Sequence, residues 1–232
     1  DGTTWRLAED EYFMTTTTAN AAKVMVFMEE LLQTRWQDLK VHLTSVSEQW
    51  AGCAIAGPKS RDVLGACLED ADVVSNENFP FMGVIDSTMK GGIPVRIARI
   101  SFSGERAFEA YVPSDYATAL MDLLWGAAEP LGGCLYGLEA LGALRIEKGH
   151  VTGTELDGRT TIDDVGLGKM ASPNKSFIGS SLRQRPELIK EDREAADKEK
   201  RQYLNIRRSL ELSDTEIQEK LAAGEPHVVR LL

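Results

Sequence analysis

The chain has 232 residues, of which 43% are hydrophobic and 27% are charged, and this balance excludes a wholly disordered or collagen-like chain. Acidic residues outnumber basic ones by 36 to 26, and the net charge of −10 argues against a dedicated nucleic-acid binder, which neutralises phosphates with basic side chains. Every apolar run is shorter than the ~20 residues of a membrane span, so we expect a soluble protein with no membrane partner.

The first half of the sequence alternates between strand-like and helix-like segments. Thr-rich and aromatic composition predicts strands at 3–9 and 11–18, joined by a hairpin turn. Apolar residues at helical spacing predict a helix at 19–33. Alternating apolar residues predict a strand at 39–43, and a short apolar run predicts another at 51–57. A proline at a helix start predicts a helix at 59–68.

The second half continues with signals of antiparallel pairing. The Gly-Gly pair at 91–92 joins two expected strands, and 107–113 reads as a third. Helices are expected at 114–129 and at 138–148, the second ending at Gly149 as helices often do. This irregular order predicts an α+β fold with antiparallel sheets and packed helices.

The composition changes near Arg193. Beyond this residue the sequence is charged and rich in Ala, Glu, Lys and Arg, which predicts a helical C-terminal tail. We therefore expect a domain at 1–192 and a tail of different origin at 193–232.

The cysteines and histidines predict no metal site. Cys53, Cys67 and Cys134 are too few and too scattered for a disulfide framework or a zinc knuckle, so a reducing compartment, the cytoplasm, is expected. The three histidines stand alone and form no H-x-x-x-H pair. The first residue is Asp1 and not Met, so we expect the sequence to be the internal part of a longer one.

An acidic group lies between 155 and 164, but its spacing does not fit a calcium loop. Turn formation and a helix start explain it better. Its members are Glu155, Asp157, Asp163 and Asp164.

The sequence has no motif for a catalytic nucleophile, a phosphate loop or a dinucleotide site. The remaining candidate for a functional group is one carboxylate, Glu109, inside an apolar strand. Alternation in 107–113 places Glu109 and Tyr111 on the face opposite Phe108. Either that face is an ordinary exposed one, or Glu109 is held in a pocket and needs a partner. A carboxylate held there is suited to accept two parallel N–H donors, such as a guanidinium or the 2-amino-4-oxo edge of a pterin.

Five blocks of the sequence stand in a recognisable order: "GPKSRDVL" (57–64), "SFSGERAFEAYVP" (101–113), "YGLEALGALRIEKGH" (136–150), "DGRTTIDDVGLGKM" (157–170) and "KSFIGSSLRQRPEL" (175–188). In order and spacing they resemble the folate-binding aminomethyltransferase family, which contains the glycine-cleavage T-protein. The opening of the chain and "HLTSVSEQWA" are most similar to the version in the C-terminal half of the sarcosine oxidase alpha subunit.

This resemblance implies a partial T-protein-like fold, in which α+β subdomains surround an opening that tetrahydrofolate enters. It also implies one-carbon transfer from an oxidised, sarcosine-like N-methyl amine to tetrahydrofolate. Flavin and NAD would be held only in other domains or subunits. The expected partners are therefore folate and a flavin-containing domain or subunit.

The resemblance assigns roles to particular residues. Glu109 stands where the family has the glutamate that binds the pterin ring, and Ala107 replaces the usual glycine beside it. Asp1 matches the end of the motif that carries the family's catalytic aspartate. Thr18 or Asn20 is expected to supply a polar contact to the cofactor.

Further binding residues are expected from the same blocks. Tyr111 and Arg145 fall at matching positions. The anionic glutamate tail of folate needs local cations on so acidic a chain, and the candidates are Arg96, Arg99 and Arg183.

The end of the chain, 209–232, resembles instead a segment of bacterial glutamyl-tRNA synthetases around "AAGEPHVIRL". The nucleotide-binding signatures of those enzymes are missing, so we interpret it as a fused tail without aminoacylation activity.

Two alternatives from other classes remain open at this point. The chain is a catalytically inactive structural or interaction fragment of the family, or its basic stretch at 183–208 and synthetase-like tail make it an RNA-associated protein. Folate titration separates the first alternative from an enzyme, and salt-dependent RNA binding tests the second.

Overall fold

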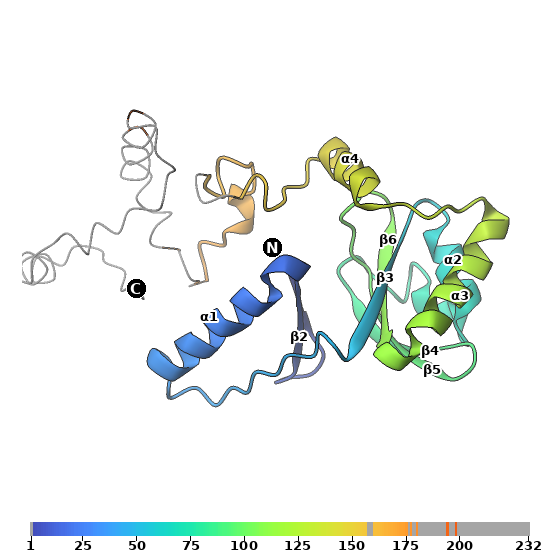
Figure 1. Ribbon diagram of the computed structural model, residues 1–232, viewed down its shortest axis with the longest axis horizontal. Coiled ribbons are helices and arrows are strands. Elements are labelled where there is room, and N and C mark those ends of the chain that lie inside the picture. Colours follow the sequence, from blue (N-terminus) through green and yellow to red (C-terminus); the bar gives the residue numbers. More distant parts are fainter. Residues whose placement is uncertain are drawn as a thin grey trace, which may run out of the picture. The chain divides into compact units, whose positions relative to one another are not determined.

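The computed structural model describes residues 2–156 and 160–175, together with residues 177, 180, 194 and 198. The chain divides into two compact units, 1–150 and 151–232, and each is described by itself (Figure 1). None of the described helices is long and apolar enough to cross a membrane.

The first unit is built on a four-stranded antiparallel sheet with the strand order β3-β6-β5-β4. Gly91 and Gly92 close the hairpin between the last two strands, both with positive φ, which glycine adopts without strain. The strands are β3 (Trp50–Ala56), β4 (Val84–Met89), β5 (Ile93–Ala98) and β6 (Ala107–Pro113).

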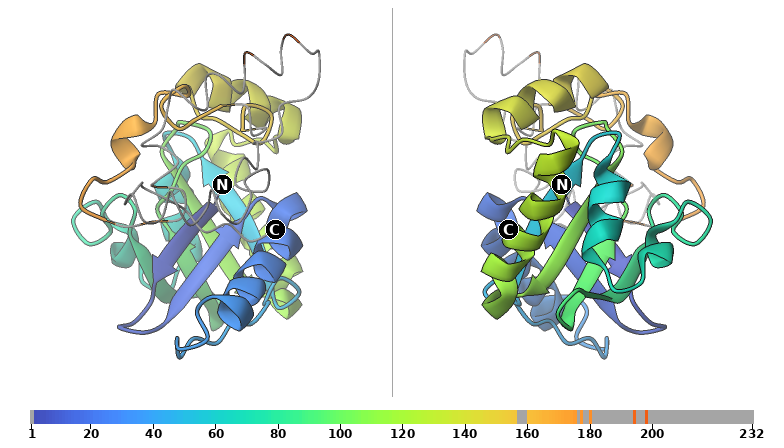
Figure 2. Two further views of the ribbon diagram at one scale, coloured as in Figure 1. Left: turned by 90° about the vertical axis from the view of Figure 1, so that its left-hand side faces the viewer. Right: turned by 90° about the vertical axis from the view of Figure 1, so that its right-hand side faces the viewer.

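Two helices, α2 (Ser60–Cys67) and α3 (Ala117–Ala128), cover one face of this sheet (Figure 2). The apolar residues of β6 that alternate toward this face, Phe108, Ala110 and Val112, are all fully buried. Burial of this face removes the largest apolar cluster of the first unit from water, which is the main driving force for folding.

A hairpin of β1 (Gly2–Arg6) and β2 (Tyr12–Thr16) packs against the opposite face of the sheet (Figure 2). Its Trp5 is buried with Ala98 and Ile100 of the sheet side, and Phe13 packs beside them. The sheet is therefore covered on both faces, by helices on one and by aromatic residues of the hairpin on the other.

Two more helices complete the first unit. After a short 3-10 turn at Thr18–Asn20, α1 runs over Ala21–Thr34. The last helix, α4 (Leu138–Lys148), ends at Gly149 in the left-handed conformation, as the sequence predicts.

Arg96 joins the hairpin to the sheet. Its guanidinium lies 5.1 Å from the ring centroid of Phe13 and 5.1 Å from that of Trp50. It also makes two parallel hydrogen bonds, of 2.8 and 2.9 Å, to the carboxylate of Asp86 on the neighbouring strand. Because the Arg96 side chain is only 12% exposed, this flat cation forms a packed bridge between the two layers.

The α+β class and the antiparallel pairing predicted from the sequence are confirmed, and the predicted elements form with shifts of a few residues at their ends. The strand predicted at 39–43 is wrong, because this segment is irregular. Leu39 and Val41 alternate as expected but are 54% and 49% exposed, and no described strand pairs with them. Alternation without a neighbouring strand does not make a sheet.

The described part of the second unit consists of turns and a short 3-10 helix at Gly168–Met170. Here Glu155 accepts a hydrogen bond from the N–H of Thr152, and Asp164 accepts one from the N–H of Thr161, both at 2.7 Å. These two carboxylates therefore stabilise turns, as predicted. The predicted boundary at Arg193 and the predicted helical tail lie outside the described residues.

We expect Arg96→Lys to lower the free energy of unfolding by about 1–2 kcal/mol. Lysine keeps the charge but loses the parallel hydrogen bonds and the flat surface that stacks on two rings. Urea denaturation of the chain measures the change. Arg35→Lys, at the exposed end of α1, is the matched control and should stay within about 0.5 kcal/mol. Equal effects of the two substitutions would contradict the bridging role of Arg96.

Candidate functional site

Strand β6 presents Glu109 on the face of the sheet that the hairpin covers. Phe108 and Ala110 point into the helix-covered core, so Glu109 between them points the other way and is half-buried. The residues directly opposite it on the two neighbouring strands are both alanines, Ala54 on β3 and Ala98 on β5. Ala54 is exposed and leaves room on the β3 side of the carboxylate, whereas Ala98 is fully buried in the cluster that contains Trp5.

Tyr111 holds Glu109 in place. Its hydroxyl donates a hydrogen bond of 2.6 Å to Glu109 Oε2, two residues away on the same strand face. Burial raises the pKa of Tyr111 far above its ordinary value, and the hydrogen bond to Glu109 and the charge of that carboxylate raise it further. The phenol therefore stays protonated at neutral pH and remains a donor.

The ring of Tyr111 has a fixed position because groups from three sides contact it. Trp5 and Phe13 of the hairpin make edge contacts, with ring centroids 5.3 and 6.2 Å away. Gly52 lies directly opposite on β3, and a Cβ there would stand 2.7 Å from the ring. The Tyr111 ring thus lies over Gly52, where the side chain of any other residue would collide with it.

Two polar groups in this layer have unused hydrogen-bonding capacity. Among the described residues, the Tyr111 hydroxyl is the only hydrogen-bond donor to Glu109, and no ion pair neutralises the carboxylate. The Trp5 Nε1–H is buried and has no hydrogen-bond partner in the described part of the chain. An ionised carboxylate accepts about four hydrogen bonds, so Glu109 is prepared to accept donors from a ligand.

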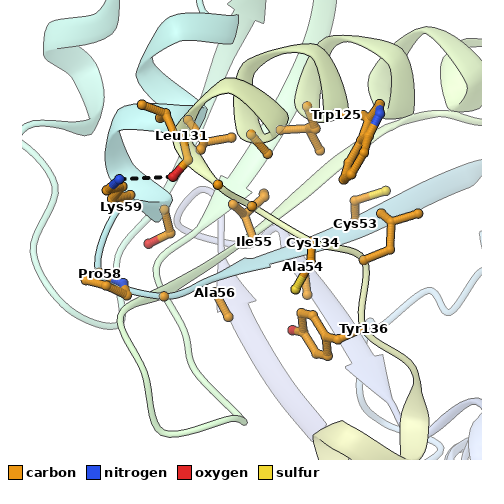
Figure 3. A pocket seen from close by; sticks show the side chains of 18 of the residues that line it. Cys53, Ala54, Ile55, Ala56, Pro58, Lys59, Trp125, Leu131, Cys134 and Tyr136 are labelled. Atoms are coloured by element: carbon orange, nitrogen blue, oxygen red, sulfur yellow. Dashed lines mark hydrogen bonds between the residues drawn. The ribbon is translucent and has the colours of Figure 1, made fainter.

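A cavity of about 550 Å³ opens beside β3, which is an edge strand of the sheet. Its lining is mostly apolar and comes from β3, α3 and the segment that connects α3 to α4, with Trp125 and Leu131 among its walls (Figure 3). Lys59 lies at this cavity and donates a hydrogen bond of 2.9 Å to the Leu131 carbonyl. Burial raises the pKa of the Cys53 thiol, which also lines the cavity.

The cavity and the Glu109 site are neighbours. Neither Glu109 nor Tyr111 lines the cavity, but Ala54, which is opposite Glu109, does. Tyr136 lines it as well, and the charge of Glu109 raises the Tyr136 pKa, after the larger effect of burial.

The structure brings together only part of the predicted site. Glu109 and Tyr111 form one unit, whereas Thr18 and Asn20 are exposed in the 3-10 turn before α1 and form no described hydrogen bond to that unit. Asp1, the predicted catalytic residue, and Arg183 lie outside the described residues, so their roles stay predictions.

The described arginines among the predicted residues have partners within the chain, and their predicted roles toward a ligand stay predictions. Arg96 is paired with Asp86. Arg99 donates a hydrogen bond of 2.6 Å to the Phe79 carbonyl. Arg145, which falls at a matching position of the family blocks, donates to the His150 carbonyl at the end of α4.

Sequence reasoning did not assign a role to Trp5, Gly52 or Tyr136. Tyr136 opens one of the quoted blocks, but its nearness to Glu109 depends on the path of a connecting segment. Gly52 is visible as a glycine inside a strand, which often marks close approach of another group. No described group of three or more His, Cys, Asp or Glu side chains could hold a metal ion.

Comparison with known proteins adds the family context. Residues 1–175 match the GCVT N-terminal domain family. The chain is 45% identical over 195 residues to the sarcosine oxidase subunit alpha of Rhizobium meliloti and 43% identical over 194 residues to that of a Corynebacterium species; each alignment covers 83% of this chain and 20% of the relative. It is 32% identical over 178 residues to an aminomethyltransferase of Streptomyces coelicolor, covering 75% of this chain and 45% of that relative.

The resemblance predicted from the ordered blocks is confirmed by these matches. The chain spans about a fifth of the length of the sarcosine oxidase subunits and less than half of the aminomethyltransferase. The predicted likeness of 209–232 to a glutamyl-tRNA synthetase segment lies outside the described residues and stays a prediction.

We expect Gly52→Ala to destabilise the chain by about 1–3 kcal/mol, because the new methyl group collides with the Tyr111 ring. Displacement of the ring should also change the near-ultraviolet circular dichroism of its aromatic cluster. Gly126→Ala in α3 is the control, since a Cβ there meets nothing within 4 Å. It should stabilise the chain by up to about 1 kcal/mol through helix propensity. A neutral Gly52→Ala would contradict the close packing of Tyr111.

We expect Tyr111→Phe to lower the free energy of unfolding by about 1–3 kcal/mol at neutral pH, since Glu109 loses its donor. The pKa of Tyr111 is raised in the folded state, so this contribution is fully present below pH ~10. At higher pH the unfolded tyrosine ionises first, and the contribution falls by about 1.4 kcal/mol per pH unit. Urea denaturation from about pH 8 to about pH 11 should show the two proteins converging. If the difference in free energy of unfolding between the unaltered chain and Tyr111→Phe does not change with pH, this prediction is wrong.

Proposed function

The chain belongs to the GCVT N-terminal domain family, and we propose that it is the folate-binding part of a longer enzyme. This enzyme would transfer a one-carbon unit from an oxidised N-methyl amine of the sarcosine type to tetrahydrofolate. The observation that carries the proposal is the half-buried Glu109 carboxylate, which one tyrosine orients and which no described cation neutralises. The sarcosine oxidase alpha subunits among the relatives support the amine class.

The chemistry of the described residues fits a pterin. The pterin ring is neutral and flat, and its 2-amino and N3–H groups form a pair of parallel donors. A carboxylate with unused lone pairs accepts such a pair in two charge-assisted hydrogen bonds. The exposed Ala54 leaves space beside the carboxylate on the β3 side, and the aromatic residues of the hairpin supply apolar surface near it.

In this proposal Glu109 anchors and orients the ring, and Tyr111 fixes the position of the carboxylate. Trp5 and Phe13 keep water away from this layer, which strengthens the hydrogen bonds made in it. Tetrahydrofolate supplies, when bound, the nitrogen atoms that accept the one-carbon unit. Asp1 would stabilise positive charge near the reacting carbon, as the resemblance implies.

Other parts of the longer enzyme would carry the oxidation. Among the proposed partners is a flavin-containing domain or subunit, since the sequence has no dinucleotide motif. We also propose a cytoplasmic location, which rests on the cysteine content. The basic stretch that suggested an RNA partner lies almost entirely outside the described residues and supports no second function.

We expect the chain to bind tetrahydrofolate weakly and Glu109→Gln to lower its affinity about tenfold or more, because a charge-assisted pair of hydrogen bonds is lost. Weak binding is expected because the remainder of the longer protein would add walls to the site. Calorimetric titration under anaerobic conditions measures both affinities.

The control for this titration is Glu105→Gln, which changes an exposed carboxylate in the loop before β6. It should bind like the unaltered chain. If Glu109→Gln binds equally well, or if millimolar tetrahydrofolate gives no binding to the unaltered chain, the proposed function is wrong.

A further inference from the structure

Tyr136 lies beside the Glu109 site on the segment that connects α3 to α4. Its ring lines the same cavity as Ala54 and Cys134 (Figure 3). Ala54 is the residue directly opposite Glu109 on β3, and the charge of Glu109 acts on the Tyr136 phenol. Two tyrosines, one from β6 and one from the connecting segment, therefore lie near the same carboxylate.

The connecting segment has a defined path where it leaves α3. The N–H groups of Gly132 and Gly133 donate to the carbonyls of Glu129 and Ala128 at 3.0 and 2.9 Å. Lys59 holds the preceding residue through its hydrogen bond to the Leu131 carbonyl. These hydrogen bonds define the path of the segment up to Gly133, three residues before Tyr136.

The Tyr136 hydroxyl has no hydrogen-bond partner within the described part of the chain, unlike that of Tyr111. The side chain is 39% exposed, so its hydroxyl is accessible to a ligand. Burial and the charge of Glu109 raise the pKa of Tyr136, and the other titratable groups lining the cavity are Cys53, Lys59, and Cys134. At neutral pH this phenol is a donor without an acceptor.

We propose that Tyr136 is a specificity-determining residue of the Glu109 site, whose hydroxyl donates a hydrogen bond to the carbonyl oxygen of the bound heterocycle. This inference rests on the proposed function. In a 2-amino-4-oxo heterocycle the carbonyl oxygen stands next to the N–H groups that Glu109 accepts. A carboxylate and a neighbouring phenol therefore match the donor, donor, acceptor order of this edge.

The proposal predicts discrimination between two ligands that differ in the group at position 4 of the ring. A 4-amino analogue presents a donor where the 4-oxo compound presents an acceptor. The 4-amino form has no hydrogen on N3, so the N–H donor that both ligands offer Glu109 at this edge is the 2-amino group. The Tyr136 hydroxyl can donate to position 4 only in the 4-oxo form. Removing this hydroxyl should therefore weaken binding of the 4-oxo ligand alone.

The experiment measures binding of tetrahydrofolate and of its 4-amino analogue to the full chain and to Tyr136→Phe. Tyr136→Phe should lower the affinity for tetrahydrofolate about threefold to tenfold and leave that for the 4-amino analogue unchanged. The matched control is Tyr116→Phe, whose tyrosine is 40% exposed in the turn before α3 and lies outside the site. It should bind both ligands like the unaltered chain.

A second readout needs no ligand. Isotope labelling of tyrosine rings allows each phenol to be titrated by NMR, and Tyr136→Phe assigns the signal. Glu109→Gln should lower the pKa of Tyr136 toward that of an ordinary tyrosine, because the neighbouring negative charge is gone. An unchanged pKa would show that the two groups are not adjacent and would overturn the inference.

The outcomes separate this inference from the proposed function. If tetrahydrofolate binds and Glu109→Gln abolishes binding, but Tyr136→Phe has no effect, the function stands and the inference fails. Equal losses for both ligands in Tyr136→Phe would indicate a merely structural role and would also overturn it. If the unaltered chain binds neither ligand, both proposals fail.

Discussion

Tyr111 connects parts of the first unit that are far apart in the sequence. Its ring contacts Trp5 and Phe13 of the hairpin, and lies over Gly52 of β3, while its hydroxyl holds Glu109. Each contact constrains the others, because a rigid ring in van der Waals contact on several sides cannot move toward one neighbour without losing another. The direction of the Glu109 carboxylate therefore depends on hairpin packing and on the absence of a side chain at position 52.

Arg96 and Glu109 lie on the same hairpin-covered face of the sheet but have different roles. Arg96 stands opposite Tyr111 on β5, but its guanidinium is already paired with Asp86 and stacked between two rings. It therefore stabilises the contact between hairpin and sheet and leaves Glu109 without a cation. A half-buried carboxylate without a neighbouring cation is energetically costly unless hydrogen-bond donors reach it. Unused hydrogen-bonding capacity of this kind is typical of a binding site.

Local patterns predicted most of this fold and half of the candidate site. Alternation in β6 identified the two faces of the strand and placed Glu109 and Tyr111 together, since residues two apart share a face. Alternation at 39–43 failed because a strand also needs a neighbour, which local sequence does not specify. The contributions of Gly52 and Tyr136 could not be predicted either, because they depend on the cross-strand register and on the path of a connecting segment.

The side chains opposite Glu109 restrict what the site can accept. Ala98 is buried with Trp5 and Gly52 lies beneath the Tyr111 ring, so the exposed Ala54 on β3 marks the open side of the carboxylate. Such a surface suits a flat ring that approaches Glu109 edge-on from the side of Ala54. A bulky, branched ligand would meet the rings of the hairpin, and an anionic edge would be repelled by an unneutralised carboxylate. Shape and charge at these few positions thus support the proposal of a neutral, planar heterocycle with N–H donors as the ligand.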